Sequence, residues 1–382
     1  MLSLFATCPK NLEGLLETEL ASLGAHATKQ TVAGVKFTGD LETAYRACLW
    51  SRLANRILLP LTTFPARSTD DLYYGIKRIK WLEHFTPQAT FVVTFNGESA
   101  FMRNTHFGEL KVKDAIVDYM RDQCGKRPNI DKHHPDLHIN VYLRNENITV
   151  YLDLSGESLH RRGYRSNAGV APLKENLASA ILYRAGWHTG NYEVFLDPMC
   201  GSGTLAIEAA LIAKNVAPGL SRKTFGFTRW LKHDAKLWQK LLQEAISKQR
   251  KKTTMKIYGY DSNAHMIATA KRNAQLAGVT NWVEFAVKKI NDCTAPPSTN
   301  HGIIVTNPPY GERLGIKSEL VSLYQDFGNT LKQNFPNWSV AVFAGNPELC
   351  KEMRMRSHKE YQFFNGALPC KLLLFMVNNR IL

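Results

Sequence analysis

The chain has 382 residues, 44% of them hydrophobic; this is too long for one ordinary core, so we expect two or three domains. Its 48 Lys and Arg outnumber 33 Asp and Glu, and the net charge of +15 indicates a polyanionic partner. No apolar run approaches the roughly 18 residues of a membrane span, and the N-terminus "MLSLFATCPKNLEG" lacks the features of an export signal. The seven cysteines form no CxxC pair, which excludes a zinc or disulfide framework, and we expect a soluble cytoplasmic protein.

The basic excess lies in the later part of the sequence. Residues 1–155 hold 18 Lys and Arg against 17 Asp and Glu, whereas residues 156–382 hold 30 against 16. Within that part, residues 222–256 hold eleven basic residues and two acidic ones. This stretch is either a nucleic-acid contact or the solvated face of a Lys-rich helix, and the sequence alone leaves both open.

The first 155 residues predict a mixed α+β region. Apolar spacing and turn residues favour, in chain order, a helix over 11–24, a strand over 34–39, a helix running into a strand over 41–61, a strand over 89–97, a helix over 108–125 and two strands over 137–156. We find no cluster of catalytic residue types in this region.

From about residue 165 the pattern changes to strands that alternate with helices. The strands are expected at 193–197, 256–261, 282–287 and 302–307, and the helices at 203–213, 263–278 and 318–335. This alternation predicts an α/β fold with a doubly wound parallel sheet, which binds ligands at the carboxyl ends of its strands.

The first of these strands ends in "LDPMCGSGTLAIEAA". Asp197 closes the strand, Gly201 and Gly203 make a turn, and Thr204 begins a helix. Glycines let a ligand approach the backbone closely, but this turn lacks the third glycine of a dinucleotide site and the lysine of a P-loop. The turn therefore favours a nucleoside without phosphates, and a glycine-rich turn without any ligand is the alternative.

The next strand ends in Asp261, followed by Ser262 and Asn263. An acid at this position is well placed to accept both hydroxyl groups of a ribose. Asp is also a common helix N-cap, but here Ser262 or Asn263 could cap the following helix instead.

The last strand runs into Asn307, Pro308, Pro309 and Tyr310, where two prolines stop any regular element. With the two earlier strand ends, this motif makes residues 165–382 resemble the S-adenosylmethionine-dependent methyltransferases that alkylate exocyclic nitrogens. The resemblance implies that the Asn307 side-chain carbonyl and the Pro308 backbone carbonyl hold the N–H groups of the target amine. Pro309 would stiffen the loop, and Tyr310 would stack on a flipped base.

The resemblance also implies a donor site and no metal, because the donor carries its own positive charge. The family usually places an acid after the third strand to contact the adenine, but Lys288 and Lys289 stand there, and Asp292 is the candidate. The implied S-adenosylmethionine-binding residues are Asp197, Pro198, Cys200, Gly201, Ser202, Gly203, Thr204, Asp261, Ser262, Asp292 and Asn307.

The N-terminal half and the junction "LDLSGESLHRRGYRSNAGVAPLKENLASAIL" resemble the THUMP-containing RNA methyltransferases. Across essentially the whole chain, the sequence is similar to the guanine-N2 half of the bifunctional bacterial 23S rRNA methyltransferases, through "SLFAT", "LWSRLANRILLPL", "KVKDAIVD", "LHRRGYR", "LDPMCGSGTL" and "NPPYGERL". This resemblance implies a ferredoxin-like segment over 1–42, a THUMP RNA-binding domain over 43–155 and a class I, Rossmann-like methyltransferase domain over 156–382. The implied reaction is methylation of guanine N2 in 23S rRNA, free or in an assembling large subunit.

The bifunctional enzymes continue into a second methyltransferase that makes 7-methylguanosine, whereas this sequence stops at Leu382. We expect either a stand-alone enzyme or a separate guanine-N7 methyltransferase chain as its partner. Two other functions stay open: an adenine-N6 DNA methyltransferase, which shares the Asn-Pro-Pro-Tyr motif, and a non-catalytic RNA-binding or remodelling protein.

Two basic segments are candidates for RNA contact. His160, Arg161, Arg162 and Arg165 lie at the domain junction, where interdomain salt bridges are the alternative. Residues 222–230 combine basic and aromatic side chains and are the candidate for holding RNA near the active site.

Overall fold

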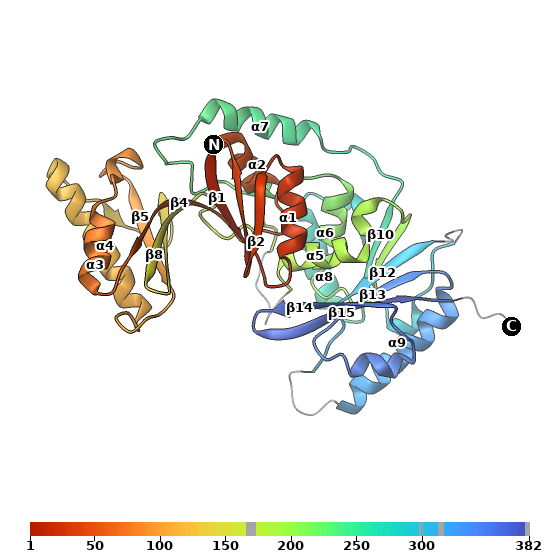
Figure 1. Ribbon diagram of the computed structural model, residues 1–382. Helices are drawn as coiled ribbons and strands as arrows, with labels where there is room; N and C mark the ends of the chain where they lie inside the picture. The colour runs from red at the N-terminus through yellow and green to blue at the C-terminus, as the bar shows by residue number, and fades with distance from the viewer. Residues whose placement is uncertain (166–172, 298, 300, 312–316, 379–382) are drawn as a thin grey trace. The chain divides into compact units, whose positions relative to one another are not determined.

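The computed structural model describes residues 1–165, 173–297, 299, 301–311 and 317–378, and its chain divides into two compact units. Unit 1 is Met1–Cys8, Leu16–Leu159 and Arg222–Gln243; unit 2 is Pro9–Leu15, His160–Ser221 and Glu244–Leu382. Figure 1 labels the elements of both. In the described part of the chain, no helix has the length and apolar character needed to cross a membrane.

Unit 1 is built on an eight-stranded sheet in the order β2-β3-β1-β4-β8-β7-β5-β6. Its strands are β1 (Leu2–Thr7), β2 (His26–Thr31), β3 (Gly34–Gly39), β4 (Arg56–Pro65), β5 (Thr90–Asn96), β6 (Asn129–Ile130), β7 (Leu137–Arg144) and β8 (Asn147–Asp153). The long strand β4 pairs antiparallel with β1 on one side and with β8 on the other. One sheet therefore carries both the N-terminal strands and the later β5–β8 group.

Three helices of this region, α2, α3 and α4, begin at polar caps. The helices of the region are α1 (Glu13–Ser22), α2 (Leu41–Trp50), α3 (Thr69–Lys77), α4 (Thr105–Cys124) and α7 (Ala235–Ser247), with the 3₁₀ turn η1 (Trp81–Glu83). Asp40 caps α2, Asn104 caps α4, and Ser68 opens α3 with a reciprocal capping box. Helices α3 and α4 lie side by side (Figure 1).

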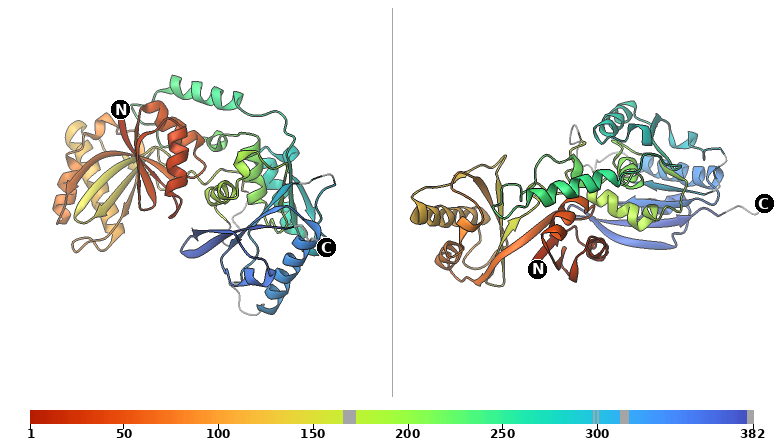
Figure 2. Two further views of the ribbon diagram at one scale, coloured as in Figure 1. Left: turned by 45° about the vertical axis from the view of Figure 1, so that its right-hand side comes forward. Right: turned by 90° about the horizontal axis from the view of Figure 1, so that it is seen from above.

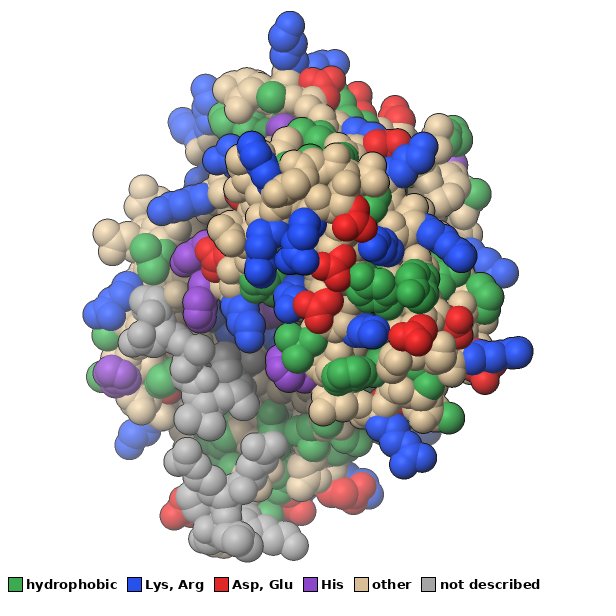
Figure 3. Space-filling model, turned by 90° about the vertical axis from the view of Figure 1, so that its left-hand side faces the viewer, with side chains coloured by type: hydrophobic (Ala, Val, Ile, Leu, Met, Phe, Trp, Pro, Cys, Tyr) green, Lys and Arg blue, Asp and Glu red, His purple; other side chains and the backbone are tan. Residues whose placement is uncertain are grey.

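Basic and acidic side chains alternate on α3 and α4. The Lys77 ammonium lies 2.6 Å from an Asp122 carboxylate oxygen, and Arg121 pairs with Asp118 at 3.2 Å. Figure 3 shows Lys and Arg interspersed with Asp and Glu over one face of the molecule. Because the two signs are mixed, these helices create no strong field of one sign.

Residues 222–243 are part of unit 1, although the residues before and after them in the sequence belong to unit 2. The Phe227 ring lies 4.4 Å from the Tyr45 ring of α2, measured between centroids, and the Tyr45 hydroxyl is 2.6 Å from His233 Nδ1. The Arg222 guanidinium donates to the backbone carbonyls of Ser155, Glu157 and Ser158. Aromatic packing and these hydrogen bonds hold residues 222–243 to the rest of unit 1.

Unit 2 is built on a seven-stranded sheet in the order β11-β10-β9-β12-β13-β15-β14. Its strands are β9 (Val194–Asp197), β10 (Lys256–Asp261), β11 (Glu284–Val287), β12 (Gly302–Thr306), β13 (Ser339–Ala344), β14 (Lys359–Asn365) and β15 (Leu368–Met376). The first five strands in this order are parallel, which confirms the predicted doubly wound α/β fold. The antiparallel pair β14 and β15, which the sequence analysis did not anticipate, extends the sheet beyond β13.

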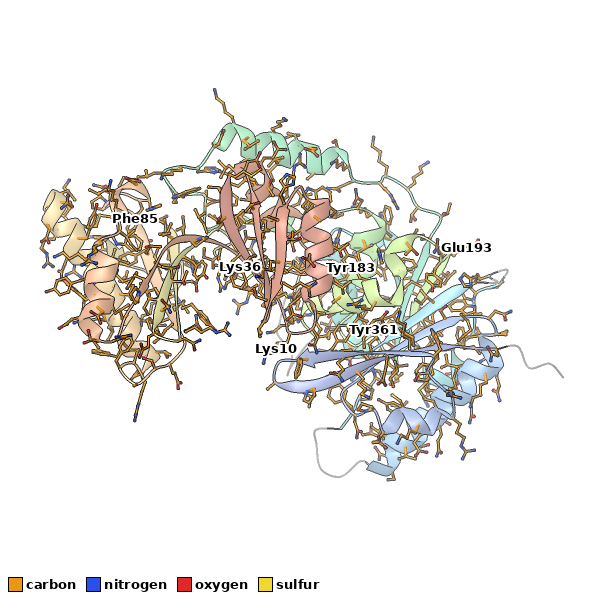
Figure 4. All side chains as sticks on the ribbon, in the orientation of Figure 1. Lys10, Lys36, Phe85, Tyr183, Glu193 and Tyr361 are labelled. Atoms are coloured by element: carbon orange, nitrogen blue, oxygen red, sulfur yellow. The ribbon has the colours of Figure 1, made fainter. Side chains whose placement is uncertain are left out.

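Helices cover both faces of this sheet. They are α5 (Glu175–Ala185), α6 (Thr204–Ala213), α8 (Ala264–Leu276) and α9 (Lys317–Asn334), and the 3₁₀ turns are η2 (Trp187–Thr189), η3 (Pro218–Ser221), η4 (Thr280–Trp282), η5 (Ile290–Asp292) and η6 (Leu349–Met353). Leu196 and Ile304 share a core with Phe327 of α9, whereas Phe195 packs on Trp187, beside α5 and α6. Figures 1 and 2 show α9 on one side of the strands and α5 and α6 on the other. Tyr361 of β14, labelled in Figure 4, lies under the guanidinium of Arg184 from α5.

A buried polar network lies between α5 and α6. Arg162 is 1% exposed, and its Nε donates to Glu208 Oε1 at 3.2 Å. Ser179 and Tyr164 also donate to the Glu208 carboxylate, at 2.8 and 3.1 Å. The charged partners are thus compensated inside unit 2, as buried ions require.

This network corrects the prediction for Arg162 and Arg165, whereas Arg161 is exposed and its RNA contact stays a prediction. Arg162 does not contact an RNA backbone, because it is buried against Glu208. Arg165 pairs with Glu175, at 3.2 Å, and donates to Thr204 Oγ1. Both ion pairs lie within unit 2, so they are not interdomain salt bridges either.

We predict that Arg162→Met lowers the free energy of unfolding by about 3–5 kcal/mol, because it leaves the Glu208 carboxylate buried without its countercharge. The double variant Arg162→Met/Glu208→Leu should recover part of this loss, because no uncompensated charge remains. Urea unfolding of the two variants and of Glu208→Leu alone measures the coupling. Strictly additive losses would contradict this account.

Candidate active site

Three strand ends meet at one edge of the unit 2 sheet. Strand β9 lies between β10 and β12 and is parallel to both, so their carboxyl ends share an edge. Asp197 ends β9, Asp261 ends β10, and Asn307 directly follows β12. The structure thus brings together the three polar residues that the sequence analysis singled out, in the place where doubly wound sheets bind ligands.

The Asp197 carboxylate joins two of these strand ends. It is 1% exposed, and its Oδ1 accepts from Thr306 Oγ1 at 2.7 Å and from the Met199 amide at 3.3 Å. Burial raises the pKa of Asp197 to about 7, and the nearby Asp261 charge acts in the same direction. Thr306 was not among the predicted site residues, although it directly precedes Asn307 in the sequence.

The turn at residues 198–203, here called the glycine turn, is fixed to β10. The Cys200 amide donates to the Tyr260 carbonyl at 2.8 Å, and the Gly201 amide donates to Asp261 Oδ2 at 2.9 Å. The Ser202 carbonyl accepts from the Asn273 side chain of α8 at 3.0 Å. Pro198 and Cys200 are buried, and burial raises the pKa of the Cys200 thiol, which keeps it protonated.

The two glycines of the turn serve different purposes. Both have positive φ, +52° at Gly201 and +85° at Gly203, which disfavours other residues. A Cβ on Gly203 would lie 2.9 Å from the Phe285 ring, so this glycine allows α6 to approach the sheet closely. Among the described residues, a Cβ on Gly201 would come within 4 Å of the Met266 methyl group alone, at 3.6 Å, so the backbone there is open to close approach.

Asp261 does not cap the helix that follows it. Its Oδ1 accepts from the Asn263 amide at 2.9 Å, and the Asn263 side chain caps α8 by accepting from the His265 and Met266 amides. This confirms that a neighbouring residue takes the capping role. Each Asp261 oxygen therefore has one backbone donor, and a carboxylate oxygen can accept a second hydrogen bond. Ser262 is exposed beside it.

Residues 307–310, here called the acceptor loop, are held by hydrogen bonds from α9 and β14. One polar atom of the loop has no hydrogen-bond partner among the described residues. This atom is Asn307 Oδ1, which is buried. The Pro309 carbonyl accepts from the Tyr324 hydroxyl at 3.3 Å, and the Tyr310 hydroxyl accepts from Asn365 Nδ2 at 3.4 Å. Pro308 is buried. Residues 312–314 of the motif and 166–172 of the junction lie outside the described residues.

The region after β11 holds the candidate adenine contact. Asp292 is exposed at the end of η5. The Lys288 ammonium lies 4.4 Å from the centroid of the Tyr260 ring, and the Lys288 amide donates to the Asp261 carbonyl. The adenine contact of Asp292 stays a prediction. Within the described ranges, no three His, Cys, Asp or Glu residues are grouped so that they could hold a metal ion.

The basic, aromatic segment of residues 222–230 requires a correction. Phe225, Phe227 and Trp230 are at most 6% exposed, so they pack in unit 1 and cannot stack on RNA bases. Arg222 is bound to three backbone carbonyls, as described above. Sequence composition could not separate these structural roles from RNA contact, because a basic, aromatic stretch suits both.

We predict that Asp197→Asn changes how stability depends on pH. The folded state raises the Asp197 pKa to about 7, so this group stabilises the fold below about pH 4 and that stability is lost as pH rises through 7. Asparagine keeps the Oδ1 acceptor without the charge. In urea unfolding, wild type should therefore lose stability relative to the variant between pH 4 and 7, by up to about 1.4 kcal/mol per pH unit. A constant difference across this range would contradict the burial of a titrating carboxyl.

Comparison with known proteins gives a consistent assignment along the chain. Residues 162–373 match the family model described as RMKL-like, methyltransferase domain; residues 3–58 match the RlmL ferredoxin-like domain, and residues 66–153 match the THUMP domain. The ribosomal RNA large subunit methyltransferase K/L of Cellvibrio japonicus is 49% identical over an alignment of 385 positions, which covers 99% of this chain and 51% of that protein. The chain spans about half the length of the curated relatives it matches.

Solved structures share the fold over its full length. A putative methyltransferase crystallised with S-adenosylhomocysteine superposes with a TM-score of 0.89 at 29% identity, covering 100% of this chain and 99% of its own. A protein described as a predicted N6-adenine-specific DNA methylase from Listeria monocytogenes superposes with a TM-score of 0.87 at 30% identity, covering 98% and 96%. The family match extends over more than half of the chain and includes every strand end of the site. The chain therefore belongs to the RMKL-like methyltransferase family.

Proposed function

We propose that this chain transfers a methyl group from S-adenosylmethionine to the exocyclic N2 of a guanine in 23S rRNA. The observation that carries the proposal is the buried Asn307 Oδ1, which has no hydrogen-bond partner among the described residues. A buried acceptor without a donor costs about 1–3 kcal/mol. A substrate N–H at this position would remove that cost, so the loop favours a ligand that carries an amine or amide.

Asn307 would prepare such an amine for methyl transfer. The lone pair of an exocyclic amine is delocalised into the base, which makes the nitrogen a poor nucleophile. The Asn307 and Pro308 carbonyls can each accept an N–H of that amine, and this fixes the direction of the lone pair. The Tyr324 hydroxyl holds the Pro309 carbonyl, so the loop has little freedom to move away from the amine.

The glycine turn fits the donor. The open backbone at Gly201 allows close approach, and the two Asp261 oxygens, each with one backbone donor, can also accept the ribose hydroxyls. S-adenosylmethionine would supply an electrophilic methyl group on a positively charged sulfur. The related structure with S-adenosylhomocysteine supports this choice, because that molecule is what remains of the donor after methyl transfer.

The choice of RNA rests on the first 155 residues. The THUMP match at 66–153 favours RNA as the substrate, and the printed name of the Cellvibrio relative favours ribosomal RNA. The Listeria relative, described as a DNA methylase, makes DNA adenine the rival substrate. The relatives named K/L are about twice as long as this chain, so part of their activity can belong to residues that have no counterpart here. The proposal therefore covers the N2 reaction alone.

We predict that the purified protein with methyl-labelled donor modifies deproteinised 23S rRNA and leaves adenine-containing duplex DNA unlabelled. Nucleoside digestion and mass spectrometry should place the label in N2-methylguanosine. Label in N6-methyladenine from DNA would reverse the assignment in favour of the rival. Labelled rRNA with the methyl group on another atom would keep the substrate and reject guanine N2.

We predict that Asn307→Ala lowers kcat by roughly 100-fold or more, because it loses the alignment of the amine. Its affinity for S-adenosylhomocysteine, measured by calorimetry, should stay close to wild type. Asp261→Ala, at the end of β10, is the matched contrast and should lose donor affinity first. If both variants lost donor affinity equally, Asn307 would belong to the donor site and not to the acceptor loop.

A further inference from the structure

The Tyr310 ring is held by residues at the ends of β13 and β14, two of the three strands that lie beyond β12 in the sheet order. Gly345 directly follows β13, and an ideal Cβ on it would lie 2.7 Å from Tyr310 Cδ2 and Cε2 and 2.9 Å from Cγ. Asn365 ends β14, and its Nδ2 donates to the Tyr310 hydroxyl at 3.4 Å. One edge of the ring and its hydroxyl are thus fixed from different strands.

The backbone of Gly345 does not itself require glycine. Gly345 is absent from the glycines with positive φ, so its conformation suits other residues. Real Cβ atoms essentially never approach other heavy atoms closer than 3.0 Å, and here three ring atoms lie inside that limit. The three atoms nearest to that Cβ all belong to the Tyr310 ring, so the ring restricts this position to glycine.

We propose that Gly345 is a positioning residue that sets the plane of the Tyr310 ring for the target base, with Asn365 fixing its hydroxyl. This inference rests on the function proposed above. A stacked base must lie parallel to the ring, and its amine must then reach Asn307, three residues away in the same loop. A tilted ring would carry the amine away from the Asn307 carbonyl, so Gly345 would influence both base binding and chemistry.

The test is a double-mutant cycle on methyl transfer with Gly345→Ala, Tyr310→Ala and the double variant. Gly345→Ala should raise KM for RNA and lower kcat, together by roughly tenfold, which corresponds to one lost stacking contact. Calorimetric affinity for S-adenosylhomocysteine should not change. In the Tyr310→Ala background the same substitution should cost nothing, because the ring that it displaces is gone.

Gly302→Ala is the matched control. Gly302 begins β12, also lacks a positive φ, and its Cβ would lie 2.5 Å from the Trp338 ring in the core. This substitution should lower stability, and its effect should be the same with and without Tyr310. Asn365→Ala introduces no clash and should raise KM for RNA and lower kcat in the same way as Gly345→Ala, but by less. It keeps the inference testable if Gly345→Ala fails to fold.

A readout independent of RNA separates this inference from the proposed function. A crystal structure of Gly345→Ala should show the Tyr310 ring displaced while β12 and β13 keep their register. A ring that has not moved, or a Gly345→Ala cost that persists without the Tyr310 ring, would overturn the inference. Wild-type protein inactive on rRNA would instead reject the proposed function, and the crystal structure would still decide whether Gly345 places the ring.

Discussion

The site depends on one carboxylate buried between two parallel strands. Asp197 Oδ1 accepts from Thr306, one residue before the acceptor loop, and from Met199 in the glycine turn. The two loops come from segments about a hundred residues apart, and this oxygen is a direct link between them. Methyl transfer needs alignment of two bound molecules more than strong acid or base catalysis, so a rigid link between their loops is what the chemistry requires.

The buried polar network between α5 and α6 also contributes to alignment, because it orients the helix that follows the glycine turn. Helix α6 begins at Thr204, directly after the turn, and its Glu208 is buried against Arg162. Arg165 donates to Thr204 itself. An apolar pair of the same volume could give equal or greater stability, but it would not fix the direction of α6 through hydrogen bonds. We interpret the network as a device for orientation at the start of this helix.

Local sequence patterns predicted most of the strands and helices around the site in unit 2, but they did not predict the hydrogen bonds and side-chain contacts that connect them. The strands that end at Asp197, Asp261 and Asn307 were predictable because each is an apolar run that stops at polar residues. Strands β1, β2, β6, β13, β14 and β15 were not predicted. Strand β13 is a buried apolar run like β12, so its composition could have shown it, whereas the largely exposed β2 is recognisable as a strand only from its antiparallel pairing with β3. The bond between Thr306 and Asp197 joins residues 109 positions apart, so no motif could reveal it. Gly345 likewise resembles any turn glycine until the Tyr310 ring is placed beside it.

The net charge of each part of the chain changes when it is counted by structural unit and not by position in the sequence. Counted along the sequence, residues 1–155 carry +1 and the remainder +14, but Arg222–Gln243 belongs to unit 1 and brings six basic residues and one acid. Unit 1 then has 23 Lys and Arg against 18 Asp and Glu, a net +5, and unit 2 has 25 against 15, a net +10. The positive field that would attract RNA is therefore spread over both units, although it stays stronger on the catalytic one. A cut at residue 155 would also take Phe227 and His233 away from Tyr45, so fragments made there would report the loss of a packed aromatic cluster along with any change in RNA affinity.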